Sequence, residues 1–407
     1  MKIMKRYCEL SRHEGNQTLF DLVEMSIAST YAGEPFHIHA EGLRGTGKTT
    51  IMRAARDVLP SITRIRGCLY NCDPAQPHCP QHRDLSPEEI AALGTEEITM
   101  PFLEISHSAK VGTVAGSIDL AKITDPNHPE AALLPGILPQ AHRGIVFIDE
   151  INRLADTSPE ITDILLDVMG QKPGRIQIEE AGLPVVEIPL MVTVWAASNP
   201  DEDPGPLEEV RRQLSDRFDM VFYMGRPTLV EVVAEILATK DRPGKKETDE
   251  DRFAARHAEY SARIEAIAKA YCESELPDFL RNFIARIYLK HNLESLRAIE
   301  AIQQGALLYS LLRKRPQPNV ADVINMIPLA LKHRVEGDTL VKIMNSLETR
   351  SPRETLFGFR GRPAEEKTPS EPKAEEKEET FAGGARRIKE LSRSELIATE
   401  KTLTPPD

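Results

Sequence analysis

The N-terminal half of the chain contains short apolar runs that have the length and continuity of buried strands. The runs at 144–150 ("GIVFIDE") and 190–200 ("LMVTVWAASNP") are almost uninterrupted, which is typical of strands covered on both faces of a parallel sheet. Shorter runs at 36–40 and 100–105 predict two further strands.

Between these runs the apolar spacing becomes helical. Ser158 and Pro159 begin a predicted helix whose apolar face follows the i, i+3, i+4, i+7 pattern, formed by Ile161, Ile164, Leu165 and Val168. Another helix is expected at 18–35, before the first strand. Because strands alternate with helices, the pattern predicts an α/β domain with a parallel sheet over residues 1–228.

After residue 228 the strand signals fade. Helical spacing is found near 229–239, 252–272, 277–290, 294–312 and 320–334. These segments predict a small all-α domain at 229–340. The remainder, 341–407, includes a Glu-, Lys- and Pro-rich stretch at 362–385 and is expected to be a largely disordered charged tail.

Three insertions interrupt the predicted α/β domain. Residues 67–100 are polar and contain cysteine and proline, whereas residues 111–143 are rich in glycine and proline. Residues 174–189 alternate around a turn at Gly182 and predict a β-hairpin. Segments of this length in a compact domain are usually functional, so we expect the last two to contact a partner.

Composition narrows the class of protein. Of 407 residues, 41% are hydrophobic and 28% are charged, as in ordinary soluble proteins. A net charge of −12 argues against nonspecific nucleic-acid binding. No apolar run approaches the roughly 18 residues of a membrane span. The first 15 residues lack the apolar core of a signal peptide, so a cytoplasmic location is expected.

A glycine-rich segment follows the first predicted strand. "GLRGTGKT" fits the phosphate-binding pattern G-x-x-x-x-G-K-[ST], with Gly42, Gly47, Lys48 and Thr49 at the fixed positions. Its alternative is a glycine-rich turn with an incidental lysine, but the strand before it and the helix after it favour ATP binding with Mg²⁺. The predicted nucleotide contacts are Gly42, Leu43, Arg44, Gly45, Thr46, Gly47, Lys48, Thr49 and Thr50.

Polar residues end the next two buried strands, where ligands bind in open α/β sheets. Asp149, with the Thr49 hydroxyl, is predicted to hold Mg²⁺, and Glu150 to polarise the attacking water. Asn199 is predicted to orient that water. The alternatives are a solvated acidic strand end and an Asn-Pro turn.

Arginines provide candidate contacts to the γ-phosphate. Arg211, Arg212 and Arg217 lie in "EVRRQLSDRFDM", and Arg297 begins a helix of the small domain. An arginine can stabilise the transition state from a neighbouring subunit. Surface salt bridges to nearby aspartates are the alternative.

Three of the five cysteines lie within twelve positions. Cys68, Cys72, Cys79 and His82 are spaced x3, x6 and x2, which suits tetrahedral zinc in a cytosolic protein. An iron–sulfur cluster or three free thiols are alternatives. His78 competes with His82 as the fourth ligand.

The ordered motifs resemble an AAA+ ATPase and, more closely, the ATPase subunit of magnesium chelatase. The resemblance covers roughly residues 15–335 and is carried by "GLRGTGKTT", "VAGSIDL", "PGILPQAHRGIVFIDEINRL", "ITDILLDV", "SNPDE", "RRQLSDRFDM" and "IPLALKHR". By position, Arg217 matches the arginine finger of that family and Arg297 its second sensor. Residues 201–210 are longer and richer in acids and proline than is usual there, and 350–407 match nothing recognisable.

The resemblance implies a homo-oligomeric ring, often a hexamer, that couples ATP hydrolysis to remodelling of a partner with a von Willebrand A domain. With a large chelatase subunit, the reaction served would be metal insertion into a tetrapyrrole. One alternative is a MoxR-like chaperone with another client. Another is a nucleotide-gated binding module without hydrolysis, against which the presence of Glu150 and Arg217 argues.

Overall fold

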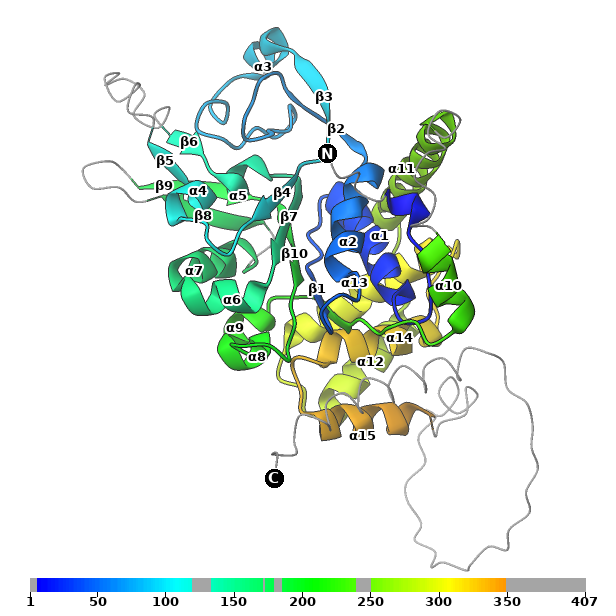
Figure 1. Ribbon diagram of the computed structural model, residues 1–407. Coiled ribbons are helices and arrows are strands. Elements are labelled where there is room, and N and C mark those ends of the chain that lie inside the picture. The colour runs from blue at the N-terminus through cyan, green and yellow to red at the C-terminus, as the bar shows by residue number, and fades with distance from the viewer. Residues whose placement is uncertain (1–5, 119–132, 171–172, 179–184, 239–249, 349–407) are drawn as a thin grey trace, which may run out of the picture.

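A five-stranded parallel sheet lies at the centre of the α/β domain (Figure 1). The computed structural model describes residues 6–118, 133–170, 173–178, 185–238 and 250–348. The sheet order is β11-β1-β10-β7-β4, and every neighbouring pair is parallel. The strands are β1 Ile38–Glu41, β4 Phe102–Ile105, β7 Gly144–Asp149, β10 Val192–Ala197 and β11 Met220–Tyr223. The predicted α/β fold is confirmed, and β11 is a strand that the apolar pattern did not indicate.

The central strands are buried on both faces. Along β7, Ile145 and Phe147 belong to one hydrophobic core, while Val146 and Ile148 belong to the other. This alternation explains why the sequence of the strand is continuously apolar.

Helices cover both faces of the sheet. One face packs against α1 Gln17–Tyr31 and α2 Lys48–Ala54, together with helices from the C-terminal half. The other face is covered by α5 Ile137–Gln140, α6 Ile151–Thr157, α7 Pro159–Val168 and α9 Arg212–Ser215. The remaining helices of this domain are α3 Pro87–Leu93, α4 Val111–Ala115 and α8 Leu207–Val210, with short 3₁₀ turns at Tyr7–Glu9 and Ala55–Val58.

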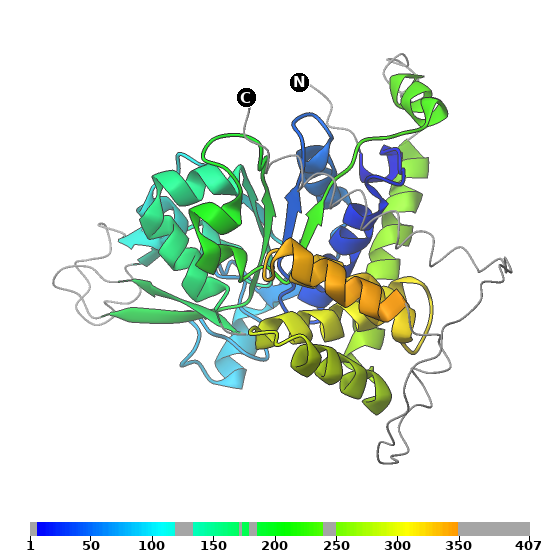
Figure 2. The ribbon, with the colours of Figure 1, turned by 90° about the horizontal axis from the view of Figure 1, so that it is seen from below.

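The part of the chain after β11 is helical where the structure describes it (Figure 2). Its helices are α10 Val230–Ala238, α11 Glu250–Cys272, α12 Asp278–Lys290, α13 Leu296–Leu312, α14 Val320–Leu331 and α15 Gly337–Glu348. The last one corrects the predicted start of the tail at 341, because α15 continues to Glu348 and buries Ile343 and Met344 against the bundle. The rest of the tail, 349–407, lies outside the described residues. No helix in the described ranges is both long and apolar enough to cross a bilayer.

A two-stranded antiparallel ribbon is associated with each insertion, and the first ribbon begins before residue 67. β2 Ser61–Ile65 pairs with β3 Thr95–Thr99, and the segment between them, with α3, forms a lobe at the top of Figure 1. β5 Gly116–Ile118 pairs with β6 Leu133–Pro135, and residues 119–132 are outside the described part. β8 Gly174–Ile178 pairs with β9 Val186–Leu190, which confirms the predicted hairpin, although its tip at 179–184 is not described.

A buried ion pair fastens the helical bundle to the first strand. The Nζ of Lys332, just after α14, donates to Oε2 of Glu41 at 2.7 Å, and the Glu41 side chain is only 4% exposed. Burial alone would raise the pKa of the Glu41 carboxyl, but Lys332 and then His39 hold that pKa below its ordinary value of 4.5. The contact therefore depends on an ionised carboxylate.

Replacing Lys332 with methionine should lower the free energy of unfolding by roughly 3 kcal/mol, because Glu41 would remain buried without its partner. The exposed pair between Arg175 and Glu187 supplies a control, since Arg175→Met should cost less than about 1 kcal/mol. Guanidinium denaturation measures the free energy of unfolding of both variants.

The contribution of Lys332 should also depend on pH, because the pKa of Glu41 is depressed in the folded state. The contribution should be complete above the pKa of Glu41 in the unfolded chain, near 4.5, and should decrease as pH falls through the pKa in the folded state. A loss for Lys332→Met equal to that of the control would contradict this assignment.

Candidate nucleotide-binding site

The loop between β1 and α2 is shaped by glycines. Gly42, Gly45 and Gly47 have φ angles of 140°, 77° and 101°, a region that side chains disfavour. At Gly42 a Cβ atom would also lie 2.7 Å from the carbonyl oxygen of Met224, the residue after β11. The loop therefore keeps this path only with glycine, and it leads directly into the N-terminus of α2, where backbone N–H groups and the helix dipole favour an anion.

Lys48 is held inside this loop. Its Nζ donates to the carbonyl oxygens of Gly42 and Leu43 at 2.6 and 2.8 Å, and to Oδ1 of Asn199 at 2.9 Å. Burial lowers the pKa of Lys48, and Asp149 opposes that shift. The ammonium group is thus partly desolvated and oriented, which strengthens its attraction for phosphate oxygens.

Two oxygens that suit Mg²⁺ lie next to Lys48. The Thr49 hydroxyl donates to Oδ1 of Asp149 at 3.1 Å. Oδ2 of Asp149 lies 3.4 Å from Nη2 of Arg53. The Nε of Arg53 also pairs with Oε2 of Glu104, at 3.1 Å. A hydroxyl and a carboxylate of this kind are common Mg²⁺ ligands beside a nucleotide. Arg53 and Glu104 were not predicted, and their contacts hold Asp149 in place.

Glu150 has a left-handed backbone, with φ of 55°, at the N-cap of α6. This turn directs the chain out of β7 immediately after Asp149. Arg153 lies 3.1 Å from its carboxylate and also approaches Glu202 at 3.6 Å. The two acids at the end of β7 therefore have different partners, which permits different roles.

These residues surround one cavity of about 270 Å³. The described residues that line it are Arg44, Gly45, Gly47, Lys48, Thr49, Thr50, Asp149, Glu150, Ser198 and Asn199. Of the predicted nucleotide contacts in the loop, Gly42, Leu43 and Thr46 are not part of this lining. Gly42 and Leu43 instead accept from Lys48, and Thr46 donates to Leu43 at 2.9 Å.

Ser198 is a lining residue that the sequence interpretation missed. Its hydroxyl lies 2.8 Å from Nε2 of His39, which is buried on β1. Burial lowers the pKa of His39 to about 4, so the imidazole is neutral at pH 7. The "SNP" motif marked the segment, but only the pairing of β1 with β10 brings His39 to Ser198.

The arginines Arg217 and Arg297 lie together, outside this cavity. Arg217 donates to the carbonyl oxygen of Gly170 at 3.3 Å. Arg297 donates to the same carbonyl and, at 3.2 Å, to that of Met169. Both guanidinium groups thus cap the C-terminal end of α7, where the helix dipole favours cations. Burial and then the charge of Arg297 lower the pKa of Arg217. Arg297 is therefore not among the described residues that line the cavity of its own chain, and its contact with nucleotide stays a prediction.

The segment that carries Arg217 is anchored by the helical bundle. Arg334, which follows α14, donates to the carbonyl oxygens of Asp216 and Phe218 at 2.8 and 2.7 Å and pairs with the Asp216 carboxylate at 3.0 Å. Arg211 forms a surface ion pair with Asp163 at 3.3 Å, as the salt-bridge alternative for this arginine predicts.

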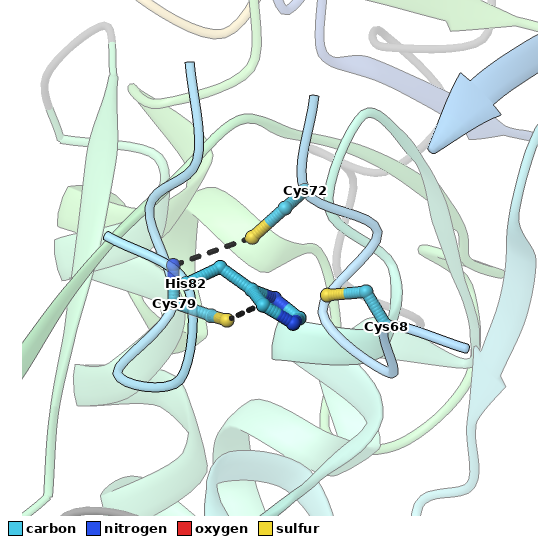
Figure 3. A group of neighbouring side chains, drawn as sticks. All are labelled: Cys68, Cys72, Cys79 and His82. Atoms are coloured by element: carbon cyan, nitrogen blue, oxygen red, sulfur yellow. Dashed lines mark hydrogen bonds between the residues drawn. The ribbon is translucent and has the colours of Figure 1, made fainter. Parts of the chain in front are cut away.

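The predicted metal ligands form a separate cluster in the insertion at 67–100 (Figure 3). Ligand atoms of Cys68, Cys72, Cys79 and His82 all lie within 4.8 Å of one another. The structure contains no disulfide between these three cysteines. Nδ1 of His78 lies 3.2 Å from the sulfur of Cys72, and its ring stacks on His142.

Comparison with known proteins finds one matching family model and several relatives. The AAA lid domain family matches residues 281–350. The magnesium-chelatase 38 kDa subunit of Acidiphilium rubrum is 29% identical over 304 residues, covering 74% of this chain and 84% of the relative. The chloroplastic magnesium-chelatase subunit ChlI of Glycine max is 28% identical over 311 residues, covering 75% and 70%. One chain of a solved cryo-EM complex of the magnesium-chelatase subunits BchI and BchD is also similar. The alignment covers 83% of this chain and 98% of that chain, at 22% identity and a TM-score of 0.42.

A loop with the phosphate-binding pattern at the carboxyl edge of a parallel sheet, followed by a segment that matches the AAA lid domain, is the arrangement of AAA+ ATPases. Within that class, the chain resembles the ATPase subunits of magnesium chelatase.

Proposed function

We propose that ATP binds with its phosphates in the cavity between the loop at 42–50 and the end of β7, and that it is hydrolysed there with Mg²⁺. The observation that carries this proposal is the convergence of Lys48, Thr49, Asp149, Glu150 and Asn199 on that cavity. Lys48 would contact the outer phosphates, while Thr49 and Asp149 would hold Mg²⁺.

Glu150 would polarise the attacking water, and Asn199 would orient it. This assignment is supported by the partners of the two acids. Asp149 is engaged by Thr49 and Arg53, whereas Glu150 has the longer side chain and lies one residue further along the turn.

We propose further that Arg217 and Arg297 act on the nucleotide of a neighbouring subunit in a ring, with six subunits as the expected number. Two guanidinium groups lie side by side at the end of α7, outside the cavity of their own chain. For both guanidinium groups, the γ-phosphate of a neighbouring nucleotide would be a stronger hydrogen-bond acceptor than a helix carbonyl.

The ring is proposed to act as a motor of the chelatase type, in which ATP hydrolysis remodels a partner protein with a von Willebrand A domain. The relatives are named as subunits of magnesium chelatase, which supports a role in a chelatase reaction; the von Willebrand A client and the tetrapyrrole are part of the proposal. The test is Mg²⁺-dependent ATP hydrolysis by the purified chain, alone and with such a partner and a large chelatase subunit. Hydrolysis that neither protein affects would favour a chaperone with another client.

The β8–β9 hairpin is the proposed contact for that partner. Replacing residues 180–186 with a Gly-Ser turn should weaken binding of the partner by roughly tenfold or more, which is the effect of removing an interface hot spot. Basal hydrolysis and ring assembly should not change, since the cavity is elsewhere. Partner-stimulated hydrolysis and analytical ultracentrifugation measure the two effects.

A matched variant exchanges the charges of the exposed Arg175–Glu187 pair, which keeps the same strands paired. It should behave as the unaltered protein does. If the shortened hairpin instead dissociates the ring, the segment joins subunits and does not engage a partner.

A further inference from the structure

The cysteine cluster lies in a part of the molecule that is poor in regular structure. Residues 66–94 connect β2 to β3, and α3 is the only regular element among them. Nevertheless Cys68, Cys72 and Cys79 are almost completely buried, together with Tyr70 and Ile90. A two-stranded ribbon with one short helix is marginal on its own, so a cross-link would add to the stability that the lobe gains by packing against the main domain.

The positions of the four side chains fit one tetrahedral ion. A zinc ion about 2.3 Å from each sulfur would place the sulfurs about 3.8 Å apart, and the imidazole nitrogen slightly closer. The four ligand atoms of Cys68, Cys72, Cys79 and His82 lie within 4.8 Å of one another, so small side-chain rotations would complete the site. Figure 3 shows the three sulfurs and the His82 ring converging on one point from three turns of the chain.

The same distances argue against the alternatives. An iron–sulfur cluster is held by ligands on different irons, which must lie farther apart than ligands of a single ion. A disulfide would pair two of the three thiols and leave a buried third thiol beside His82. Three thiolates and one imidazole are, in contrast, a common donor set for structural zinc.

Backbone donors support a thiolate at Cys72. The N–H groups of His78 and Cys79 donate to its sulfur at 3.4 and 3.3 Å. Such donors orient a ligand and stabilise its negative charge in metal sites. Cys79 and His82 are also joined locally, since Nδ1 of His82 is 3.2 Å from the Cys79 sulfur and the N–H of His82 donates to the Cys79 carbonyl.

The segment that contains the cluster contacts the main domain just before β7. Asn71 donates to the carbonyl oxygen of Gln140 at 2.6 Å. Arg143 pairs with Asp73 at 3.2 Å and donates to the carbonyl oxygen of Thr63 at 2.6 Å. A metal that fixes the turn at 68–82 would therefore also fix how the lobe meets the start of β7, the strand that ends at Asp149.

We propose that Cys68, Cys72, Cys79 and His82 bind one Zn²⁺ per chain, and that this zinc is structural. Four protein ligands leave no coordination position for water or substrate, which distinguishes the site from a catalytic one. The zinc cross-links a lobe that has little regular structure, and it keeps Asn71 and Asp73 in position for their contacts with the main domain.

Elemental analysis of the full chain, purified without chelator, should find about one zinc per chain and little iron. Titrating the native protein with an organomercurial should release that zinc as the thiols react, a readout that requires no variant and no ATP. Replacement by Co²⁺ should give the visible and near-ultraviolet bands of tetrahedral thiolate coordination. Protein that contains no zinc and binds neither ion after reconstitution overturns the proposal, as does protein that contains stoichiometric iron.

Paired variants identify the ligands. His82→Ala and Cys79→Ser should lose most of the zinc, whereas His78→Ala and Cys272→Ser should retain it. Cys272 is an exposed thiol remote in sequence, and His78 is the nearest alternative imidazole. Full retention by His82→Ala, or loss by His78→Ala alone, would overturn the assigned ligand set. If a ligand variant is insoluble, the organomercurial and Co²⁺ measurements on the unaltered chain still decide whether the metal is present.

Discussion

Glu150→Gln is expected to bind ATP normally and to hydrolyse it roughly 10²- to 10⁴-fold more slowly, the range that a general base contributes. The amide has nearly the same shape as the carboxylate and can keep the left-handed turn at the N-cap of α6, but it cannot accept a proton from water. Equilibrium binding of a fluorescent nucleotide and steady-state phosphate release measure the two effects. The variant should therefore lose kcat and retain affinity.

Two controls separate this role from a general loss of charge. Glu202→Gln removes another carboxylate near Arg44 and Arg153, and it should hydrolyse ATP at close to the normal rate. Lys48→Ala should lose nucleotide binding itself, because it removes the desolvated ammonium group at the loop. Near-normal hydrolysis by Glu150→Gln would remove the proposed base.

The nucleotide cavity could be predicted from sequence because each of its parts is contiguous. The loop at 42–50 has a fixed local pattern, and the two acids directly follow an apolar run. Parallel strands end at one edge of a sheet, so Asp149 and Asn199 had to lie near Lys48 once the strands were recognised. The structure brings these residues together, whereas their catalytic roles stay predictions.

Features that depend on distant pairs could not be predicted. Lys332 and Glu41 are 291 positions apart, and Arg334 reaches Asp216 across 118 positions, although "IPLALKHR" was recognised as a motif. Neither partner shows in its local sequence that it is paired. The meeting of Arg217 with Arg297 at the end of α7 is of the same kind.

The missed helix α15 has a different cause. Leu340, Ile343, Met344 and Leu347 follow helical spacing and pack against the bundle, so a local signal was present. The polar and charged residues that follow it drew the predicted boundary to 341, seven residues before the helix ends. The apolar spacing itself continues to Leu347, at the end of the helix.

Mixing two inactive proteins should restore hydrolysis if Arg217 serves a neighbouring nucleotide. Arg217→Ala alone should slow hydrolysis roughly 10³- to 10⁵-fold, as loss of an arginine finger does. Its own cavity remains intact, however, and a Lys48→Ala subunit still carries an intact Arg217. In equal random mixtures, about a quarter of the interfaces would combine the two intact halves, so about a quarter of normal hydrolysis should return.

The matched control mixes Lys48→Ala with Glu150→Gln, because both lesions lie in the same cavity and no interface can then be whole. That mixture should show no recovery beyond the residual rate of Glu150→Gln. Arg297→Ala should be rescued by Lys48→Ala in the same way as Arg217→Ala, since both guanidinium groups lie on one carbonyl at the end of α7. Arg211→Ala, which loses only a surface pair with Asp163, should need no rescue. Absence of recovery in rings that demonstrably contain both subunits would show that Arg217 acts within its own chain, and α7 would then have to release it toward Lys48.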